Sequence, residues 1–172
     1  LYSSAIGFDT SLMNGLQSLE QWQNFMDFPT GAWLGFMNAV SPLGSLVVTA
    51  FGTSFIADKY GRKPCMIACV FLIWFGAGLG AGAKNPAMFI VGRFMVGAGA
   101  AFGVTSALLI SELAYPTHRA VATSLYNYFF YVGSLVSAWV TFGTRNLSNE
   151  WAWRIPTLLQ AGLTPIILLN TL

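Results

Sequence analysis

The sequence predicts an all-α integral membrane protein, built as a bundle of six transmembrane helices. Of its 172 residues, 55% are hydrophobic and only 8% are charged, a composition that separates the chain from soluble domains. Six apolar stretches alternate with short polar ones, and each approaches the roughly 20 residues that a helix needs to cross a bilayer. The net charge of +2 is too small and too scattered for a phosphate-binding surface, which excludes nucleic acid as a partner.

The predicted spans cover about 1–17, 30–56, 65–83, 87–110, 119–142 and 151–172. Proline and glycine inside these stretches are better tolerated in membrane helices than in soluble ones. The chain begins without Met inside one apolar stretch and ends inside another. We therefore expect the bundle to be incomplete at both ends and to form part of a longer protein.

Charge concentrates in the segment 57–64, between the second and third spans. Gly61 permits a tight reversal there, because it has no side chain to obstruct one, and Pro64 suits the first turn of the next helix. The loops after the second and fourth spans carry the basic residues Lys59, Arg62, Lys63 and Arg119. By the positive-inside rule, these loops are expected to face the cytoplasm.

The opposite ends of the spans show two features of an extracytoplasmic side. Four tryptophans fall near them, as expected of an interfacial belt: Trp22, Trp33, Trp151 and Trp153. The triplet Asn146-Leu147-Ser148 fits an N-glycosylation acceptor, which only an extracytoplasmic loop could use, although such triplets also occur by chance.

The sequence predicts neither a cofactor nor a metal site. Cys65 and Cys69 lie four residues apart, but no His or third Cys lies near, so we interpret them as small packing residues. The glycines at 76–81 and 97–99 resemble a dinucleotide-binding turn, yet they lie inside apolar segments and not between a strand and a helix. Small residues with this spacing let membrane helices approach closely, which is the interpretation we favour.

Two ionisable residues of opposite charge, Asp9 and Arg93, fall inside predicted spans. Such residues are costly in a bilayer unless they are paired, and they indicate functional sites. Counted along their helices at about 1.5 Å per residue, both lie roughly 10 to 12 Å below the outer surface. The two can therefore pair, and the pair could load and release a proton when the helices move. The alternatives are a static salt bridge and an Asp9 that faces water.

A second group of charged residues lies in the two predicted cytoplasmic loops. It comprises Asp58, Arg62 and Lys63 after the second span, and Glu112 and Arg119 after the fourth. Ion pairs within this group could close the inner side in one state and break in another, as alternating access requires. Alternatively, the basic side chains only anchor the helices at the lipid interface, a role that alone would not require Asp58 or Glu112.

Taken together, the motifs resemble those of the sugar porters of the major facilitator superfamily, over essentially the whole chain. Segment 58–63 resembles the signature loop after the second helix, and Glu112 with Arg119 resembles the loop after the fourth. The other motifs are Gly92-Arg93 with Gly97 and Gly99, Gly7-Phe8-Asp9, and Trp153-Arg154-Ile155-Pro156 with Gln160. The last of these looks most like fungal lactose-permease and cellodextrin-type members, and the chain as a whole is most similar to fungal lactose-permease and hexose-transporter-type members.

This resemblance implies the amino-terminal six-helix half of a transporter with a 3+3 inverted repeat. Sugar would bind between this half and a missing carboxy-terminal half, and the family's proton-coupling acid corresponds to Asp9. Asn127 stands where sugar porters usually carry a substrate-binding Gln, and it keeps the amide donor and acceptor on a shorter side chain. A contact to another helix is the alternative role for Asn127. Ser54 and Ala101 replace family glycines with other small residues.

The expected function is transport of a mono- or disaccharide by alternating access, coupled to protons, across the plasma membrane. A facilitated-diffusion carrier and a transporter-like sensor that binds sugar without moving it are the alternatives. An enzyme is not expected, because an intramembrane hydrolase needs a nucleophile with a base or metal ligands in a span, and the only histidine, His118, falls in a loop.

Overall fold

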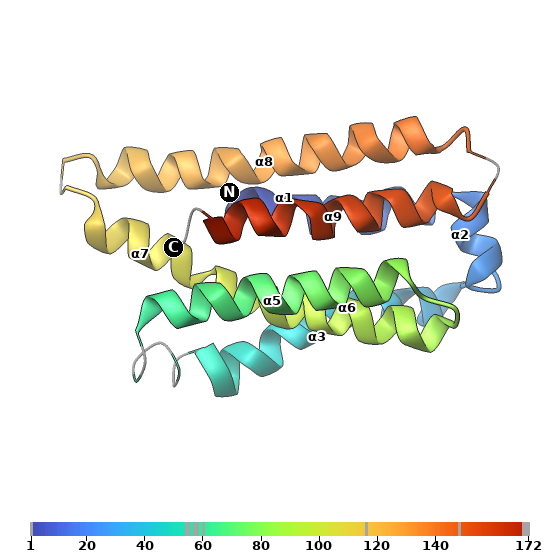
Figure 1. Ribbon diagram of the computed structural model, residues 1–172, viewed down its shortest axis with the longest axis horizontal. Coiled ribbons are helices and arrows are strands. Elements are labelled where there is room, and N and C mark those ends of the chain that lie inside the picture. The colour runs from blue at the N-terminus through green and yellow to red at the C-terminus, as the bar shows by residue number, and fades with distance from the viewer. Residues whose placement is uncertain are drawn as a thin grey trace.

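The computed structural model describes residues 2–53, 56, 59, 61–115, 117–147 and 149–169. The regular elements of these residues are helices, and the long ones run roughly along the long axis of the molecule (Figure 1). In chain order they are α1 (Tyr2–Gln17), α2 (Glu20–Phe25), α3 (Gly31–Val48), the π-helical turn η1 (Thr49–Thr53), α5 (Arg62–Ala81), α6 (Pro86–Gly103), α7 (Thr105–Leu113), α8 (Arg119–Thr144) and α9 (Trp151–Leu169).

The connections between the long helices gather at two opposite ends of the bundle (Figure 1). One end carries the start of α5 and the turn from α7 to α8, and the other carries α2 and the turns that lead into α6 and α9. We call the first the inner end and the second the outer end, following the orientation that the basic residues predict. Gly61 stands at the inner end with φ of 88°, a backbone conformation that glycine adopts readily.

Three helical segments of the described chain are long and apolar enough to cross a bilayer: Gly31–Phe51, Arg62–Ala81 and Pro86–Leu113. Helix α1 is shorter, with 16 residues. Helices α8 and α9 are long enough but do not reach the same apolar character. Together α1, α8 and α9 carry polar side chains such as Asp9, Asn127 and Gln160.

Two local features differ from the sequence-based expectation. The polar connection expected after the first span contains α2, which is held in place because Trp22 is completely buried and meets Phe89 edge-on. The fourth span is interrupted at Val104, between α6 and α7. There the hydroxyl groups of Thr105 and Ser106 donate to the carbonyls three residues earlier, both at 2.6 Å, and such bonds compete with regular helix geometry.

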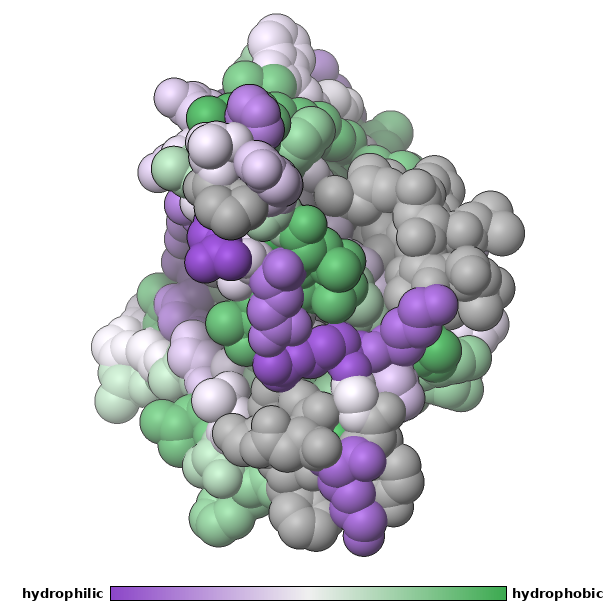
Figure 2. All heavy atoms as spheres, turned by 90° about the vertical axis from the view of Figure 1, so that its left-hand side faces the viewer, coloured by the Kyte–Doolittle hydropathy of each residue, from purple (hydrophilic) through white to green (hydrophobic). Residues whose placement is uncertain are grey.

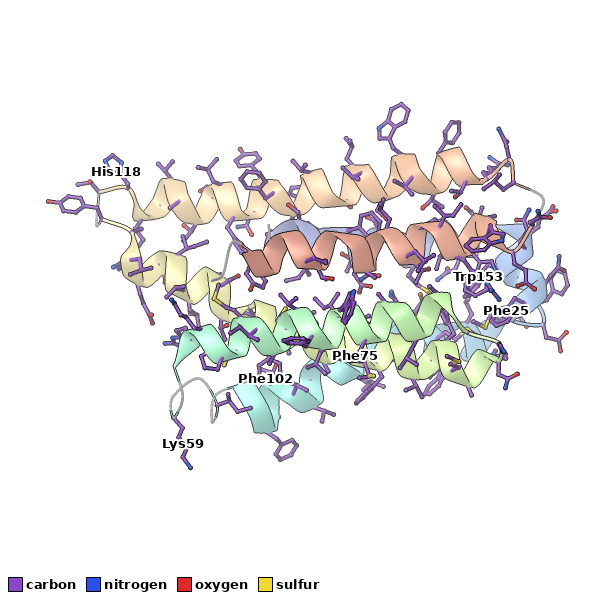
Figure 3. All side chains as sticks on the ribbon, in the orientation of Figure 1. Phe25, Lys59, Phe75, Phe102, His118 and Trp153 are labelled. Carbon is purple, nitrogen blue, oxygen red and sulfur yellow. The ribbon has the colours of Figure 1, made fainter. Side chains whose placement is uncertain are left out.

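The interfacial role expected of Trp22 and Trp153 is wrong. Both side chains are fully buried, and they belong to an apolar cluster at the outer end in which Trp153 packs against Phe25 and Phe89 (Figure 3). Trp33 and Trp151, by contrast, are 46% and 55% exposed. Two of the four tryptophans are thus buried, because the short α2 covers the outer end of the bundle and packs against α6 and α9 there.

Helices α1 and α8 meet backbone to backbone at two glycines. A Cβ atom at Gly7 would collide with the carbonyl oxygen of Phe130, and one at Gly133 would collide with the carbonyl oxygen of Ser4. Each helix therefore contributes one glycine and one carbonyl, three residues apart, to the contact. Such small-residue contacts are the means by which membrane helices pack at short range.

Helices α3 and α6 repeat this arrangement with a different set of residues. A Cβ atom at Gly97 would collide with the carbonyl oxygen of Ser41, and one at Gly44 would collide with that of Phe94. The same spacing of three residues recurs on both helices. The hydroxyl of Ser45 adds a hydrogen bond of 2.6 Å to the carbonyl of Gly97.

The two glycine contacts reveal an internal repeat. Gly7 on the first helix corresponds to Gly97 on α6, 90 residues later, and Gly44 on α3 corresponds to Gly133 on α8, 89 residues later. The first helix of each three-helix unit therefore packs against the second long helix of the other unit: α1 packs against α8, and α6 packs against α3. This exchange is the packing expected of an inverted repeat of three helices in each unit.

Candidate functional site

Asp9 and Arg93 form an ion pair between α1 and α6. The Nη1 atom of Arg93 lies 2.6 Å from Oδ1 of Asp9, and both side chains are only 9% exposed. The contact predicted from the depth of the two residues is therefore present. An ion pair in so dry a setting is stabilised by mutual attraction only if further hydrogen bonds compensate the loss of water.

Two more helices supply such hydrogen bonds to the Asp9 carboxylate. Nε2 of Gln160, on α9, donates to Oδ1 at 2.9 Å, and Oγ of Ser41, on α3, donates to Oδ2 at 3.5 Å. Gln160 and Ser41 are themselves buried. A single carboxylate thus ties α1 to α3, α6 and α9, and the Asp9 site comprises Asp9, Ser41, Arg93 and Gln160.

Sequence reasoning noted Gln160 only as part of a family resemblance and did not place it or Ser41 in the site. A long polar amide inside an otherwise apolar helix was an available signal, since such a side chain needs a partner in another helix. Ser41 gave no comparable signal, because serine is common at close contacts between membrane helices.

The Asp9 site lies between an open cavity and the closed core. The open cavity has a volume of about 200 Å³ and is lined by Ile6, Asp9, Thr10, Met13, Asn14, Asn38, Ser41, Pro42, Ser45, Arg93 and Ala100. On the core side, Arg93 and Gln160 border a cavity of about 10 Å³, room for one water molecule at most. The carboxylate can therefore be reached from one side, through a cavity whose lining combines amide and hydroxyl side chains with apolar ones.

Asn127, the predicted sugar contact, lies apart from this cavity. It is on α8, its side chain is exposed, and it is absent from the lining of the cavity beside Asp9. Within the described residues its side chain makes no hydrogen bond to another helix, which leaves the amide available to a ligand or to another part of the protein.

Of the predicted inner-end cluster, two residues form an ion pair. Nη2 of Arg62, at the start of α5, lies 2.7 Å from Oε1 of Glu112 in the last turn of α7, with side chains 30% and 50% exposed. Glu112 is therefore helical and not in a loop. Lys63 and Arg119 are exposed at the same end and form no ion pair within the described part of the chain. Asp58 lies outside the described residues.

Hydrophilic side chains cross the centre of the inner end when it is viewed along the helices (Figure 2). Lys59 and His118 mark its two edges in the side view (Figure 3). The charges at this end and the buried Asp9 site are thus two separate groups.

The described residues contain no group of three or more His, Cys, Asp or Glu side chains arranged to hold a metal ion. Cys65 and Cys69 are free thiols buried against Ile73 and Phe102, in keeping with a packing role.

An internal repeat of helices and a buried ion pair inside a membrane bundle are features that many membrane transport proteins share. The family model described as "Sugar (and other) transporter" matches residues 1–172. The chain belongs to this family.

Two curated relatives illustrate the relationship. The chain is 27% identical over 155 residues to high-affinity glucose transporter 1 of Candida albicans, which covers 90% of the chain and 28% of that protein. It is 35% identical over 128 residues to H(+)/hexose cotransporter 2 of Parachlorella kessleri, which covers 74% of the chain and 23% of that protein. The chain thus spans about a quarter of the length of these relatives.

Among the solved structures that match are those of the xylose transporter XylE from E. coli. Its partially occluded inward open conformation superposes with a TM-score of 0.84 at 19% identity, covering 99% of this chain and 46% of XylE. At this level of identity the likeness concerns the fold, which is that of one half of a major facilitator superfamily transporter.

Proposed function

We propose that the full-length protein moves a mono- or disaccharide across the membrane by alternating access, coupled to protons through Asp9. The observation that carries the proposal is the Asp9 carboxylate, which is bonded to three other helices and borders a cavity whose lining includes amide and hydroxyl side chains. The names of two relatives, a glucose transporter and an H(+)/hexose cotransporter, support sugar as the substrate and the proton as the coupling ion.

The charge on Asp9 determines how firmly α1 is held to its neighbours. When Asp9 is ionised, its bonds to Arg93 and Gln160 are charge-assisted and therefore stronger than bonds between neutral groups. A proton on Asp9 removes its attraction to Arg93 and weakens the link between α1 and α6. Protonation would thus release one helix of the bundle, which is the change that a coupled cycle needs.

The sugar is proposed to bind at the cavity beside Asp9, which α1, α3 and α6 line. Asn14 and Asn38 line the cavity beside Asp9, and amide side chains both donate to and accept from sugar hydroxyls. Asn127 offers a further amide on the exposed side of α8. Because Asp9 borders the same cavity as two of these amides, a bound sugar would lie close to the group that takes up the proton.

The inner-end charges are proposed to form a cytoplasmic gate that comprises Asp58, Arg62, Lys63, Glu112 and Arg119. The Arg62–Glu112 ion pair represents the closed arrangement within this half. Within the described residues Lys63 and Arg119 form no ion pair, so acidic groups of the second half could bind them and the gate could exchange partners between the inward and outward states.

The proposal is tested with full-length protein in proteoliposomes, by measuring uptake of labelled D-glucose and D-xylose with and without an inward proton gradient. We expect Asp9→Asn to abolish accumulation against a gradient while exchange of sugar at equal pH on both sides persists. Asp27→Asn is the matched control, because Asp27 is exposed, and its φ of 57° is one that Asn also tolerates.

Other outcomes identify the alternatives. Gradient-driven accumulation that is unchanged in Asp9→Asn would refute coupling through this residue. Uptake by the unmodified protein that only equilibrates the sugar would indicate a facilitated carrier, and sugar binding without uptake would indicate a sensor. The proposed location is the plasma membrane, which fluorescence microscopy of the tagged full-length protein in its own cells would test.

A further inference from the structure

A second open cavity lies between α1 and α8 at the outer end. Its volume is about 380 Å³, within the range of roughly 300 to 1,000 Å³ that is usual for small-molecule sites. Its lining includes Asn14, Gly15 and Ser18 from α1 and Thr141, Phe142 and Arg145 from α8. We propose that this cavity, the outer cavity, is a second sugar site that holds a neutral sugar before the sugar reaches Asp9. This inference rests on the proposed function of sugar transport.

The outer cavity adjoins the cavity beside Asp9. Asn14 borders both of them, and it follows Asp9 by five residues, or about 7.5 Å along α1. Arg145 caps the outer end of α8, and Ser18 directly follows the last residue of α1. A sugar that enters from the outer end would therefore meet the outer cavity first and pass Asn14 on its way to Asp9.

Contacts between α1 and α8 form the base of the outer cavity. A Cβ atom at Gly15 would lie 2.7 Å from Cγ2 of Thr141, so the two helices can approach there only because residue 15 has no side chain. One turn deeper, the hydroxyl groups of Ser11 and Ser134 are hydrogen-bonded to each other. The base of the cavity is thus already formed within this half of the protein, which reduces the ordering that ligand binding would require.

Two long polar side chains of the outer cavity have no partner in the described part of the chain. Asn14 and Arg145 are exposed, and neither side chain makes a hydrogen bond or an ion pair with another described residue. The guanidinium of Arg145 has only donor groups, whereas the amide of Asn14 both donates and accepts. Both side chains can therefore bind the oxygen atoms of a ligand.

Two hydroxyl groups of the outer cavity supply acceptors. Oγ1 of Thr141 donates to the carbonyl of Ser137 at 2.8 Å, and Oγ of Ser18 donates to the carbonyl of Gly15 at 2.7 Å. Each hydroxyl has thereby used its one proton and keeps lone pairs that accept from a ligand. An anion would use only the donors of this cavity and a metal cation only its acceptors, whereas the hydroxyl groups of a neutral sugar use both.

Phe142 adds an aromatic surface to the outer cavity. It is 68% exposed and lines the cavity together with the polar groups. The face of an aromatic ring carries partial negative charge, and the C–H groups of a sugar ring carry partial positive charge, so the two attract each other. The combination of an aromatic ring with an amide, a guanidinium and hydroxyl groups favours a sugar over a lipid chain, which offers no hydrogen-bonding groups.

The first test measures initial uptake of labelled D-glucose and D-xylose by full-length protein in proteoliposomes, over a series of external concentrations. For Arg145→Leu we expect KM to rise about tenfold, as for loss of one hydrogen bond to a charged group, with the maximal rate within about twofold of the unmodified protein. Lys84→Leu is the matched control, because Lys84 is also exposed at the outer end but does not line the cavity. It should leave KM unchanged.

The second test measures occupancy of the outer cavity by thiol labelling of the full-length protein in intact cells, with other reactive cysteines replaced. A membrane-impermeant maleimide should label Ser18→Cys from outside, and D-glucose or D-xylose should slow this reaction. Adding Arg145→Leu should raise the sugar concentration for half protection about tenfold. Gly143→Cys is the control that sugar should not protect, since Gly143 is exposed at the same end of α8 with nothing near it.

Three results would overturn the inference: an unchanged KM in Arg145→Leu, equal protection of the two thiols by sugar, or a Ser18→Cys thiol that the maleimide never labels. The last of these would indicate that the second half of the protein fills the outer cavity. If the unmodified protein takes up neither sugar, the proposed transport function fails, whereas selective protection of Ser18→Cys by sugar would still support the outer site.

Discussion

Arg62 and Glu112 are 50 positions apart in the chain, and their side chains meet at 2.7 Å at the inner end. The pair joins the first residue of α5 to the last turn of α7. Because both side chains are substantially exposed, the pair contributes below about 1 kcal/mol to stability. Its main effect is therefore to hold the start of α5 beside the end of α7, and not to stabilise the fold.

Reversing both charges of this pair tests its proposed role in the gate. We expect Arg62→Glu and Glu112→Arg each to slow sugar uptake severalfold, because each places like charges in contact. The double variant should recover much of the rate, since it restores an attractive pair. Initial uptake rates of the full-length protein would measure this, and equal rates in single and double variants would argue for mere anchoring.

The backbone contact at Gly97 should tolerate no side chain. In Gly97→Ala the new methyl group would collide with the carbonyl of Ser41, so α3 and α6 would have to separate. Overpacking typically costs about 1–3 kcal/mol, and a backbone collision lies at the upper end of this range or beyond. Thermal unfolding in detergent would show a lowered midpoint. Gly78→Ala is the control, because nothing lies near that position.

The buried tryptophan at the outer end should contribute strongly to stability. Trp153 is completely buried, whereas the nearby Trp151 is 55% exposed. Trp153→Ala is expected to cost about 3–5 kcal/mol through loss of burial and the cavity it leaves. Trp151→Ala should change the free energy of unfolding by less than about 0.5 kcal/mol. Equal losses in chemical denaturation would contradict the burial of Trp153.

Thiol labelling can test the orientation of the helices. Cys65 and Cys69 are buried and should not react with a membrane-impermeant maleimide in the folded protein. Thr117→Cys and Asn146→Cys place exposed thiols at the inner and outer ends. In intact cells expressing the full-length protein, with other reactive cysteines replaced, only Asn146→Cys should be labelled. Labelling of Thr117→Cys alone would reverse the assignment of inside and outside.

The ion pair at the centre of the site was accessible to sequence reasoning. Two lone ionisable residues of opposite charge lay at similar depth, and the cost of an unpaired charge in a membrane made their contact the natural expectation. The helical class followed equally directly from composition and from the apolar stretches. Both inferences depend on large free energies, the cost of an unpaired charge in a membrane and the gain from placing apolar stretches there, which outweigh the details of side-chain packing.

Other parts of the site depend on how the helices pack, which spacing alone does not reveal. Gln160 reaches Asp9 because of the rotation and register of α9 against α1, and the two residues are 151 positions apart. The burial of Trp22 and Trp153 depends on α2, a short helix of six residues that covers the outer end. The placement of Asn127 outside the Asp9 cavity likewise depends on the rotation of α8.

The reciprocal glycine contacts also fix which residues of the two repeats are equivalent. Since Gly7 matches Gly97, Asp9 matches Gly99 on α6. A Cβ atom at Gly99 would lie only 3.0 Å from the carbonyl oxygen of Cys69. At the position where the first repeat has an acid between helices, the second repeat therefore has a close contact between the backbones of α6 and α5.

Arg93 has an equally dissimilar counterpart, Ser3, whose hydroxyl donates to the carbonyl of Tyr126 at 2.5 Å. The duplicated scaffold thus carries its ionisable pair in one orientation only. A symmetric transplant of the pair would require Gly99→Asp, and α5 would have to withdraw to make room for it. The repeat of the backbone therefore predicts which helices meet, but the second repeat has no ion pair equivalent to Asp9 and Arg93.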